Sequence, residues 1–181
     1  MEIIETPLEG LYVLKPSIFE DSRGYFFESY NKQKFDALVP GDYNFIQDNE
    51  SKSQKNVLRG LHFQNPPYQQ AKLVRVVKGS VLDVAVDVRK NSKTYGKHFT
   101  IQISEANKLQ FFISPGFAHG FLTLEDNTVF SYKCTNFYNK ESEAGLLWNC
   151  PEIGINWDVQ APLLSEKDLI LPSLKNFYSK F

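Results

Sequence analysis

The sequence predicts an all-β fold of the sandwich or barrel class, which includes jelly rolls and cupins. Aromatic residues make up 14% of the 181 residues, with 15 Phe and 9 Tyr, and such residues favour strands over helices. Many short apolar or alternating runs are separated by turn signals such as Pro66-Pro67 and Ser114-Pro115-Gly116, as in sandwiches and barrels. No repeat, low-complexity segment or Gly/Ser linker interrupts this pattern, so we expect a single domain over residues 1–181.

The strands are expected at regular intervals along the chain. The clearest are residues 72–78 and 81–88, two alternating runs that meet at Gly79-Ser80 and are typical of a β-hairpin. In the second run, Asp83 and Asp87 share one face, opposite the aliphatic residues. Further strands are expected over residues 10–16, 24–30, 45–51, 57–63, 97–104, 110–113, 120–123 and 128–135.

Helical character is confined to two short segments. Residues 31–39 have a helical pattern that ends at Pro40-Gly41. Residues 164–169 are expected to form a short helical turn starting from Ser165. The stretch 141–181 is less regular, and we expect it to pack as a cover over one end of the barrel.

Composition excludes several classes of protein. The net charge is −1, with 42% apolar and 23% charged residues, which argues against a general binder of nucleic acids or membrane surfaces. No apolar run approaches the ~20 residues needed to cross a bilayer, and no signal peptide is visible at residues 1–7. Cys134 and Cys150 have no CxxC spacing. We therefore expect a cytoplasmic protein with two reduced thiols.

Polar side chains are expected inside the β core. Residues 57–64 (VLRGLHFQ) and 116–121 (GFAHGF) place His62 and His119 within otherwise apolar runs. Burying a histidine or arginine is costly unless the group has a partner or a ligand, so the pattern indicates a polar pocket. Arg59 and His62 would lie on opposite faces of a regular strand, unless Gly60 marks a bulge.

The residues alone leave the chemistry of this pocket open. A metal site is not favoured, because no HxH or HxxxH pair exists and His98 is expected at the surface. Acid–base catalysis needs a base, an acid and a cation, roles open to His62, Tyr132, Lys72 and Asp168, although packing explains such residues equally well. Phosphate contacts are open to Arg23 and Arg59, whereas surface ion pairing is preferred for Arg75 and Arg89.

These segments resemble the dTDP-4-dehydrorhamnose 3,5-epimerase family over roughly residues 2–172. The resemblance rests on ordered segments: FEDSRGYFFE at 19–28, QDN at 47–49, VLRGLHFQ at 57–64, QQAKLVRVVKGSVLDVAVDVR at 69–89, SPGFAHGF at 114–121, the Tyr132 strand and LSEKD at 164–168. One departure is visible. The family often reads Trp-Asn-Asp-Pro where this chain has Trp148-Asn149-Cys150-Pro151.

The resemblance implies a cupin-type jelly-roll β-barrel (double-stranded β-helix) that needs no metal and no cofactor and acts as a homodimer. The substrate it implies is a nucleotide-diphosphate 4-keto-6-deoxy sugar, most often dTDP-4-dehydro-6-deoxyglucose, which would be converted to dTDP-4-dehydrorhamnose. His62 matches the base and Asp168 its partner. Tyr132 matches the acid, and Lys72 the lysine that stabilises the enolate oxygen.

The resemblance also implies the binding residues. Gln47, Asn49, Arg59 and His119 match positions near the sugar and diphosphate. The segment over about residues 1–30 would be exchanged between subunits, so that Arg23 and Glu28 reach a nucleotide across the interface. Candidates for stacking on the base are Phe19, Phe26 and Tyr138, and Glu143 and Lys167 match binding positions more loosely.

Other functions remain open at this point. Relatives with the same base and acid act on GDP-linked 4-keto-6-deoxy-heptoses, and some invert C3 alone. A sugar-nucleotide 3,4-ketoisomerase and a non-catalytic nucleotide-sugar binding protein would share the barrel. The non-catalytic protein is disfavoured because the base, the acid and the lysine are all present. The ketoisomerase is disfavoured because the segment RGLHFQ together with Asp168 fits the epimerase pattern.

Overall fold

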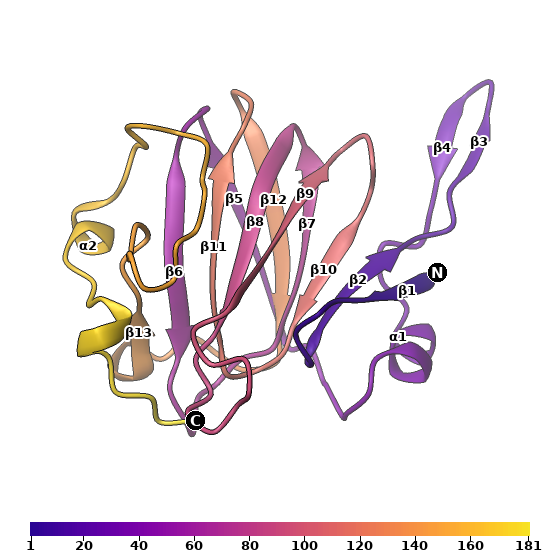
Figure 1. Cartoon of the computed structure of the whole chain (residues 1–181). Coiled ribbons are helices and arrows are strands. Elements are labelled where there is room, and N and C mark those ends of the chain that lie inside the picture. Colours follow the sequence, from indigo (N-terminus) through magenta and orange to yellow (C-terminus); the bar gives the residue numbers. More distant parts are fainter.

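Two antiparallel β-sheets face each other in the computed structural model, which describes residues 1–181 (Figure 1). One sheet has six strands in the order β1-β2-β10-β7-β12-β5, with bounds Glu2–Glu5, Leu11–Lys15, Gln110–Ile113, Lys72–Lys78, Thr128–Cys134 and Gln47–Ser53. The other has five strands in the order β13-β6-β11-β8-β9, with bounds Glu143–Gly145, Leu58–Gln64, Phe117–Thr123, Ser80–Asp87 and His98–Ser104. The predicted all-β jelly roll is confirmed.

Both predicted helices are present. Helix α1 (Lys32–Leu38) begins after Asn31, whose side chain accepts a hydrogen bond from the backbone N–H of Lys34, as an N-cap does. Helix α2 (Glu166–Leu169) begins after Ser165, whose side chain accepts from the backbone N–H of Asp168. Two short 3₁₀ helices, η1 (Lys140–Ser142) and η2 (Leu174–Asn176), complete the helical content. No helix is long and apolar enough to cross a membrane.

Apolar side chains pack in three clusters. The first lies between the sheets and includes Phe111 and Phe130. The second lies on the outer face of the six-stranded sheet, where Phe35 of α1 packs. The third covers the outer face of the five-stranded sheet with side chains of the C-terminal segment, including Ile153 and Trp157.

The predicted hairpin between residues 72–78 and 81–88 is wrong. Both segments are strands, but β7 pairs with β10 and β12 while β8 pairs with β9 and β11. Gly79, at φ +81°, lies where the chain passes from one sheet to the other. Alternation identifies a strand but not its partners, and both faces of a jelly-roll strand can be buried. Asp83 and Asp87 are accordingly buried.

Several boundaries differ from those expected. β1 and β13 were not expected, nor was β3 (Phe19–Asp21), and the strand expected at 24–30 is only β4 (Gly24–Phe26). These strands have three or four residues, which is too short for a periodic pattern to be recognised. β11 begins three residues earlier than expected, at Phe117, and β5 begins two residues later, at Gln47.

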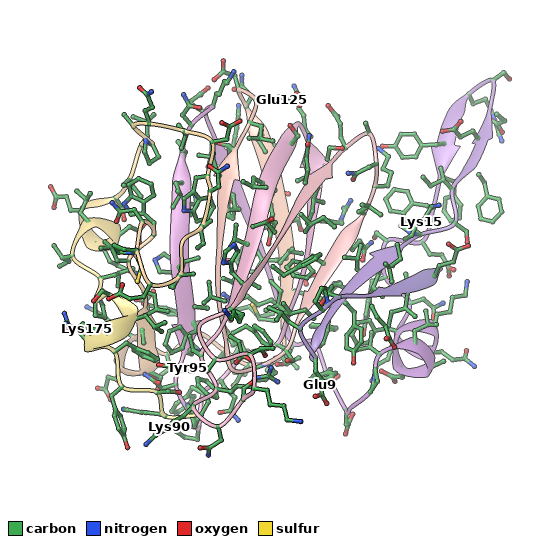
Figure 2. The ribbon with its side chains drawn as sticks, in the orientation of Figure 1. Glu9, Lys15, Lys90, Tyr95, Glu125 and Lys175 are labelled. Atoms are coloured by element: carbon green, nitrogen blue, oxygen red, sulfur yellow. The ribbon has the colours of Figure 1, made fainter.

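The hairpin of β3 and β4 projects away from the barrel (Figure 1). The side chains of Phe19 and Phe26 are 65% and 66% exposed, and Tyr25 is also exposed. Figure 2 shows aromatic rings projecting from this hairpin into solvent. Large exposed apolar groups of this kind mark interaction surfaces.

We expect Gly60→Ala to destabilise the barrel by about 2–4 kcal/mol, because backbone strain and overpacking add. Gly60 has φ +118°, and a Cβ there would lie 2.6 Å from Gly120 Cα and 2.7 Å from His119 O. Gly24→Ala is the matched control, since φ is +130° but nothing lies within 4 Å. Chemical denaturation of both variants measures the difference, and equal losses would contradict the close approach of β6 and β11.

Candidate active site

A histidine and a carboxylate form the centre of the site. His62 lies on β6, and its Nε2 is 2.5 Å from Oδ1 of Asp168, the third residue of α2. Asp168 is 2% exposed. Burial alone would raise the pKa of the Asp168 carboxyl, but hydrogen bonds, led by the one to His62, outweigh burial and hold this pKa below its ordinary value. The carboxylate therefore stays charged and orients the imidazole.

A bulge at Gly60 brings Arg59 to the same side as His62. On β11, His119 pairs with His62 and Phe121 pairs with Arg59, so two residues of β6 between these pairs lie opposite one residue of β11. Such a bulge re-aims one side chain. Arg59 and His62 consequently line the same cavity, and the alternative of opposite faces is excluded.

The cavity has a volume of about 490 Å³ and lies between the sheets, with α2 at one wall. His62 comes from the five-stranded sheet and Tyr132 from the six-stranded sheet, and both line it. A second cavity of about 200 Å³ shares His62, Lys72 and Tyr132 with the first. These three side chains therefore lie where the two cavities meet.

Lys72 and Tyr132 have altered acidity. Burial lowers the pKa of the Lys72 ammonium, although the nearby charges of Cys134, Asp83 and Glu143 oppose this effect. Lys72 forms no side-chain hydrogen bond, so its ammonium is free for a ligand oxygen. Burial raises the pKa of the Tyr132 phenol. Tyr132 is therefore protonated at neutral pH and can act as an acid.

A second buried pair lies beside the first. His119 Nε2 is 2.9 Å from Asp83 Oδ1, and both side chains are buried. Burial raises the pKa of the Asp83 carboxyl, with His119 and Lys72 partly offsetting the shift. The sequence predicts only that Asp83 lies on a strand face, and its pairing with His119 was not predicted. An aspartate within an apolar strand is the signal that could have indicated it.

A polar cluster lines the second cavity. The Tyr138 hydroxyl donates to Glu143 Oε2 at 3.1 Å, and Lys167 Nζ donates to Glu143 Oε1. Burial would raise the pKa of Glu143, but the hydrogen bond and charge of Lys167 hold it below its ordinary value. Gln47 and Asn49 on β5 are joined by a 3.0 Å hydrogen bond.

Residues 5–176 match the sequence profile of the family described as dTDP-4-dehydrorhamnose 3,5-epimerase. The chain belongs to this family. It is 50% identical over 169 residues to the dTDP-4-dehydrorhamnose 3,5-epimerase of Shigella flexneri, covering 93% of each chain. The family is one of carbohydrate epimerases, which are isomerases.

Solved structures of epimerases share the fold. The dTDP-4-dehydrorhamnose 3,5-epimerase of Elizabethkingia anophelis is 49% identical with a TM-score of 0.93, and the match covers 97% of each chain. The dTDP-6-deoxy-D-glucose-3,5-epimerase of Legionella pneumophila, in complex with dTDP-4-keto-L-rhamnose, is 42% identical with a TM-score of 0.94. That match covers 98% of this chain and 94% of the other. The resemblance inferred from the motifs is confirmed, as is the cupin-type fold.

The epimerase fold gathers most of the expected residues. The first cavity is lined by Arg59, His62, Lys72, His119, Tyr132, Lys167 and Asp168, and the second adds Gln47, Asn49, Tyr138 and Glu143. Ser51 also lines the first cavity and was missed. Its position, two residues after Asn49 on β5, is the signal that could have identified it.

Four expected residues lie away from both cavities of this epimerase chain. Phe19, Arg23 and Phe26 belong to the β3–β4 hairpin, where Arg23 pairs with Asp21 at 2.6 Å. Glu28 pairs with Lys34 of α1. In Figure 1 the hairpin and α2 lie on opposite sides of the molecule.

Other expectations from the sequence had mixed outcomes. Arg89 pairs with Asp87 at 2.7 Å, so the expected ion pair is present, but Asp87 is fully buried and the pair is not at the surface. Arg75 forms no ion pair. His98 is half-buried, not at the surface as expected, and burial lowers the pKa of its imidazole. Cys134 and Cys150 are both free and buried.

We expect Lys72→Met to make the epimerase more stable and less active. Burial lowers the Lys72 pKa from 10.5, so the charged ammonium costs stability at neutral pH, and this cost disappears as the pH rises towards 10.5. At pH 7 we expect unfolding roughly 2–4 °C higher than in the wild type, a gap of about 1 kcal/mol. The difference in unfolding temperature between variant and wild type should narrow at alkaline pH. The activity of Lys72→Met should be about 10²-fold lower than that of the wild type.

Lys133→Met is the matched control for this substitution. Lys133 follows Tyr132 on β12 and forms a surface ion pair with Asp48 at 2.9 Å, which contributes less than about 1 kcal/mol. Thermal unfolding between pH 6 and 10 compares the two variants. A lower unfolding temperature for Lys72→Met at pH 7 would show that the ammonium is stabilised by its neighbours.

Proposed function

We propose that this chain inverts C3 and C5 of dTDP-4-dehydro-6-deoxyglucose to give dTDP-4-dehydrorhamnose. The observation that carries the proposal is the placement of a paired histidine, a tyrosine from the opposite sheet and a free lysine around one cavity. The family and the ligand named for the Legionella relative support the choice of substrate.

The arrangement supplies each part of a proton-transfer reaction. The C4 ketone acidifies the hydrogens at C3 and C5. His62 removes one as a proton, Asp168 stabilises the resulting imidazolium, and the electron pair moves to O4 as an enolate. Lys72 stabilises that oxygen. Tyr132 then delivers a proton to the opposite face, which inverts the carbon. The ketone is already present in the substrate, so no redox cofactor is needed.

The binding residues extend from this centre through both cavities. We assign Gln47, Asn49, Arg59 and His119 to the sugar and diphosphate, which accept hydrogen bonds from amides, guanidinium and imidazole. Tyr138, at the outer end of the second cavity, is assigned to stacking on the nucleotide base. Glu143 and Lys167 hold the Tyr138 hydroxyl end of this subsite.

A panel of 4-keto sugars incubated in D₂O tests the activity. We expect deuterium at both C3 and C5 of the dTDP-hexose, read by NMR, with the inverted product formed. Exchange at C3 alone would indicate a C3-only epimerase. Preference for the GDP-linked heptose would indicate the alternative substrate. A shift of the ketone from C4 to C3 would indicate a ketoisomerase, and binding without exchange a non-catalytic protein.

The active form is proposed to be a homodimer with shared sites in the cytoplasm. Exposed Phe19, Arg23 and Phe26, with Glu28, would complete the nucleotide site of a second copy. The buried, unpaired Cys134 and Cys150 support a reducing compartment.

Mixing two inactive variants tests the shared site. Arg23→Ala and His62→Ala damage different chains of each site, so a hybrid dimer holds one intact site. We expect activity to reappear on mixing after exchange of subunits. A fully active monomer in sedimentation, or no recovery in a demonstrated hybrid, would contradict the shared site.

A further inference from the structure

Three hydrogen bonds hold the buried side chain of Gln64, close to His62 on the same strand. It lies at the end of β6, two residues after His62, and is 4% exposed. Its Nε2 donates to the carbonyl oxygens of Tyr68 at 2.6 Å and Phe137 at 3.1 Å. Its Oε1 accepts from the backbone N–H of Asn139 at 2.7 Å.

Two of these contacts flank Tyr138. Phe137 and Asn139 are its neighbours in the segment between β12 and η1, which has no regular secondary structure. No backbone–backbone hydrogen bond holds Phe137 or Tyr138. The segment is held by side chains instead, with Gln64 on both sides of Tyr138 and Gln47 Oε1 accepting from the Tyr138 N–H at 3.2 Å. The Tyr138 ring itself is 57% exposed and could not hold its own position by packing.

We propose that Gln64 is a positioning residue for the nucleotide subsite, which fixes Tyr138 relative to the strand that carries His62. This inference rests on the proposed function, in which Tyr138 stacks on the base. Adjacent inward positions of a strand are about 6.6 Å apart, so one rigid strand sets the spacing between the reacting carbon and the base. A ring held in place before binding loses less entropy when the ligand arrives.

Gln64→Met tests the proposal, because it keeps the length of the side chain and removes all three hydrogen bonds. We expect the affinity for dTDP, measured by calorimetry, to fall about tenfold, as lost hydrogen bonds of this number allow. KM for the dTDP-sugar should rise by a similar factor, with kcat within about twofold because the His62–Asp168 pair is untouched. A merely structural role would lower the unfolding temperature without this split.

The matched control is Thr128→Val, which keeps the shape of the side chain. Thr128 is also fully buried and donates one hydrogen bond, to Glu125 O at 2.8 Å, and it lies outside both cavities and the N-terminal segment. We expect lower stability and unchanged dTDP affinity. If Gln64→Met does not fold, Gln64→Glu keeps the acceptor for Asn139 N–H and loses both donated bonds, so weaker dTDP binding is still expected.

A double-mutant cycle with Tyr138→Ala decides the point. If Gln64 acts through Tyr138, adding Gln64→Met to Tyr138→Ala causes no further loss of dTDP affinity. Losses that add in the double variant, or a Gln64→Met variant that binds dTDP normally, would overturn the positioning role alone. Normal dTDP binding by Tyr138→Ala itself would overturn the nucleotide subsite of the proposed function, and the positioning role with it.

Discussion

Replacing His62 with alanine is expected to abolish deuterium exchange at both C3 and C5 of the 4-keto sugar. One base is expected to serve both carbons, because the His62 side chain is 27% exposed, whereas His119, which is paired with Asp83 and assigned to substrate binding, is only 7% exposed. Removing a general base costs about 10²–10⁴-fold in rate. Exchange in D₂O is the measurement, since it reports proton removal even when no inverted product accumulates.

His98→Ala is the control for the loss of an imidazole. His98 is half-buried on β9 and lines neither cavity, so exchange should continue at the wild-type rate. Calorimetry with dTDP should show that His62→Ala still binds the nucleotide. Exchange retained at either carbon in pure His62→Ala would identify a second base.

Tyr132→Phe is expected to separate exchange from inversion. Without the phenol, His62 still removes a proton and returns one to the same face, so deuterium enters while configuration is retained. The ratio of deuterium incorporation to epimer formation should therefore rise well above the wild-type value. Burial raises the pKa of the Tyr132 phenol, so the wild type carries the phenolic proton throughout the neutral pH range. Phenylalanine has no such proton to donate.

The phenylalanine fills the same space, so folding should change little. Deleting one hydroxyl alters stability by about 1 kcal/mol at most. Tyr30→Phe removes a half-buried hydroxyl outside the cavities and should leave the ratio unchanged. An unaltered ratio with both rates intact in Tyr132→Phe would mean that water or another side chain is the acid.

The long strands and both helices could be predicted from the sequence, because hydrophobic periodicity and helix-capping residues involve only residues that are close together in the chain. Asn31 and Ser165 cap the helices where the sequence indicates. Partner choice is different. The alternating runs on either side of Gly79 predict two strands equally well in one sheet or in two. The pairing depends on residues up to 62 positions away in the chain, as where Lys72 pairs with Cys134 on β12.

In the active site too, contacts between residues far apart in the chain could not be predicted from local sequence patterns. His62 and Asp168 are 106 residues apart, so no spacing rule joins them, and only the family motifs paired them in advance. The bulge at Gly60 was one of two open readings, because a glycine permits a bulge without requiring it. Asp83 could not be paired with His119 from alternation alone, since both lie within buried strands.

Asp168 lies on α2, which follows every strand of the barrel in the chain. During translation, β1 to β13 can emerge and pair before the residues of α2 leave the ribosome. The imidazole of His62 thus meets its carboxylate only after every strand of the barrel has been synthesised. Limited proteolysis between Gly145 and Leu163, followed by release of the C-terminal fragment, should abolish epimerase activity. The cut fragment carries the Asp168 carboxylate, and its loss also exposes the outer face of the five-stranded sheet.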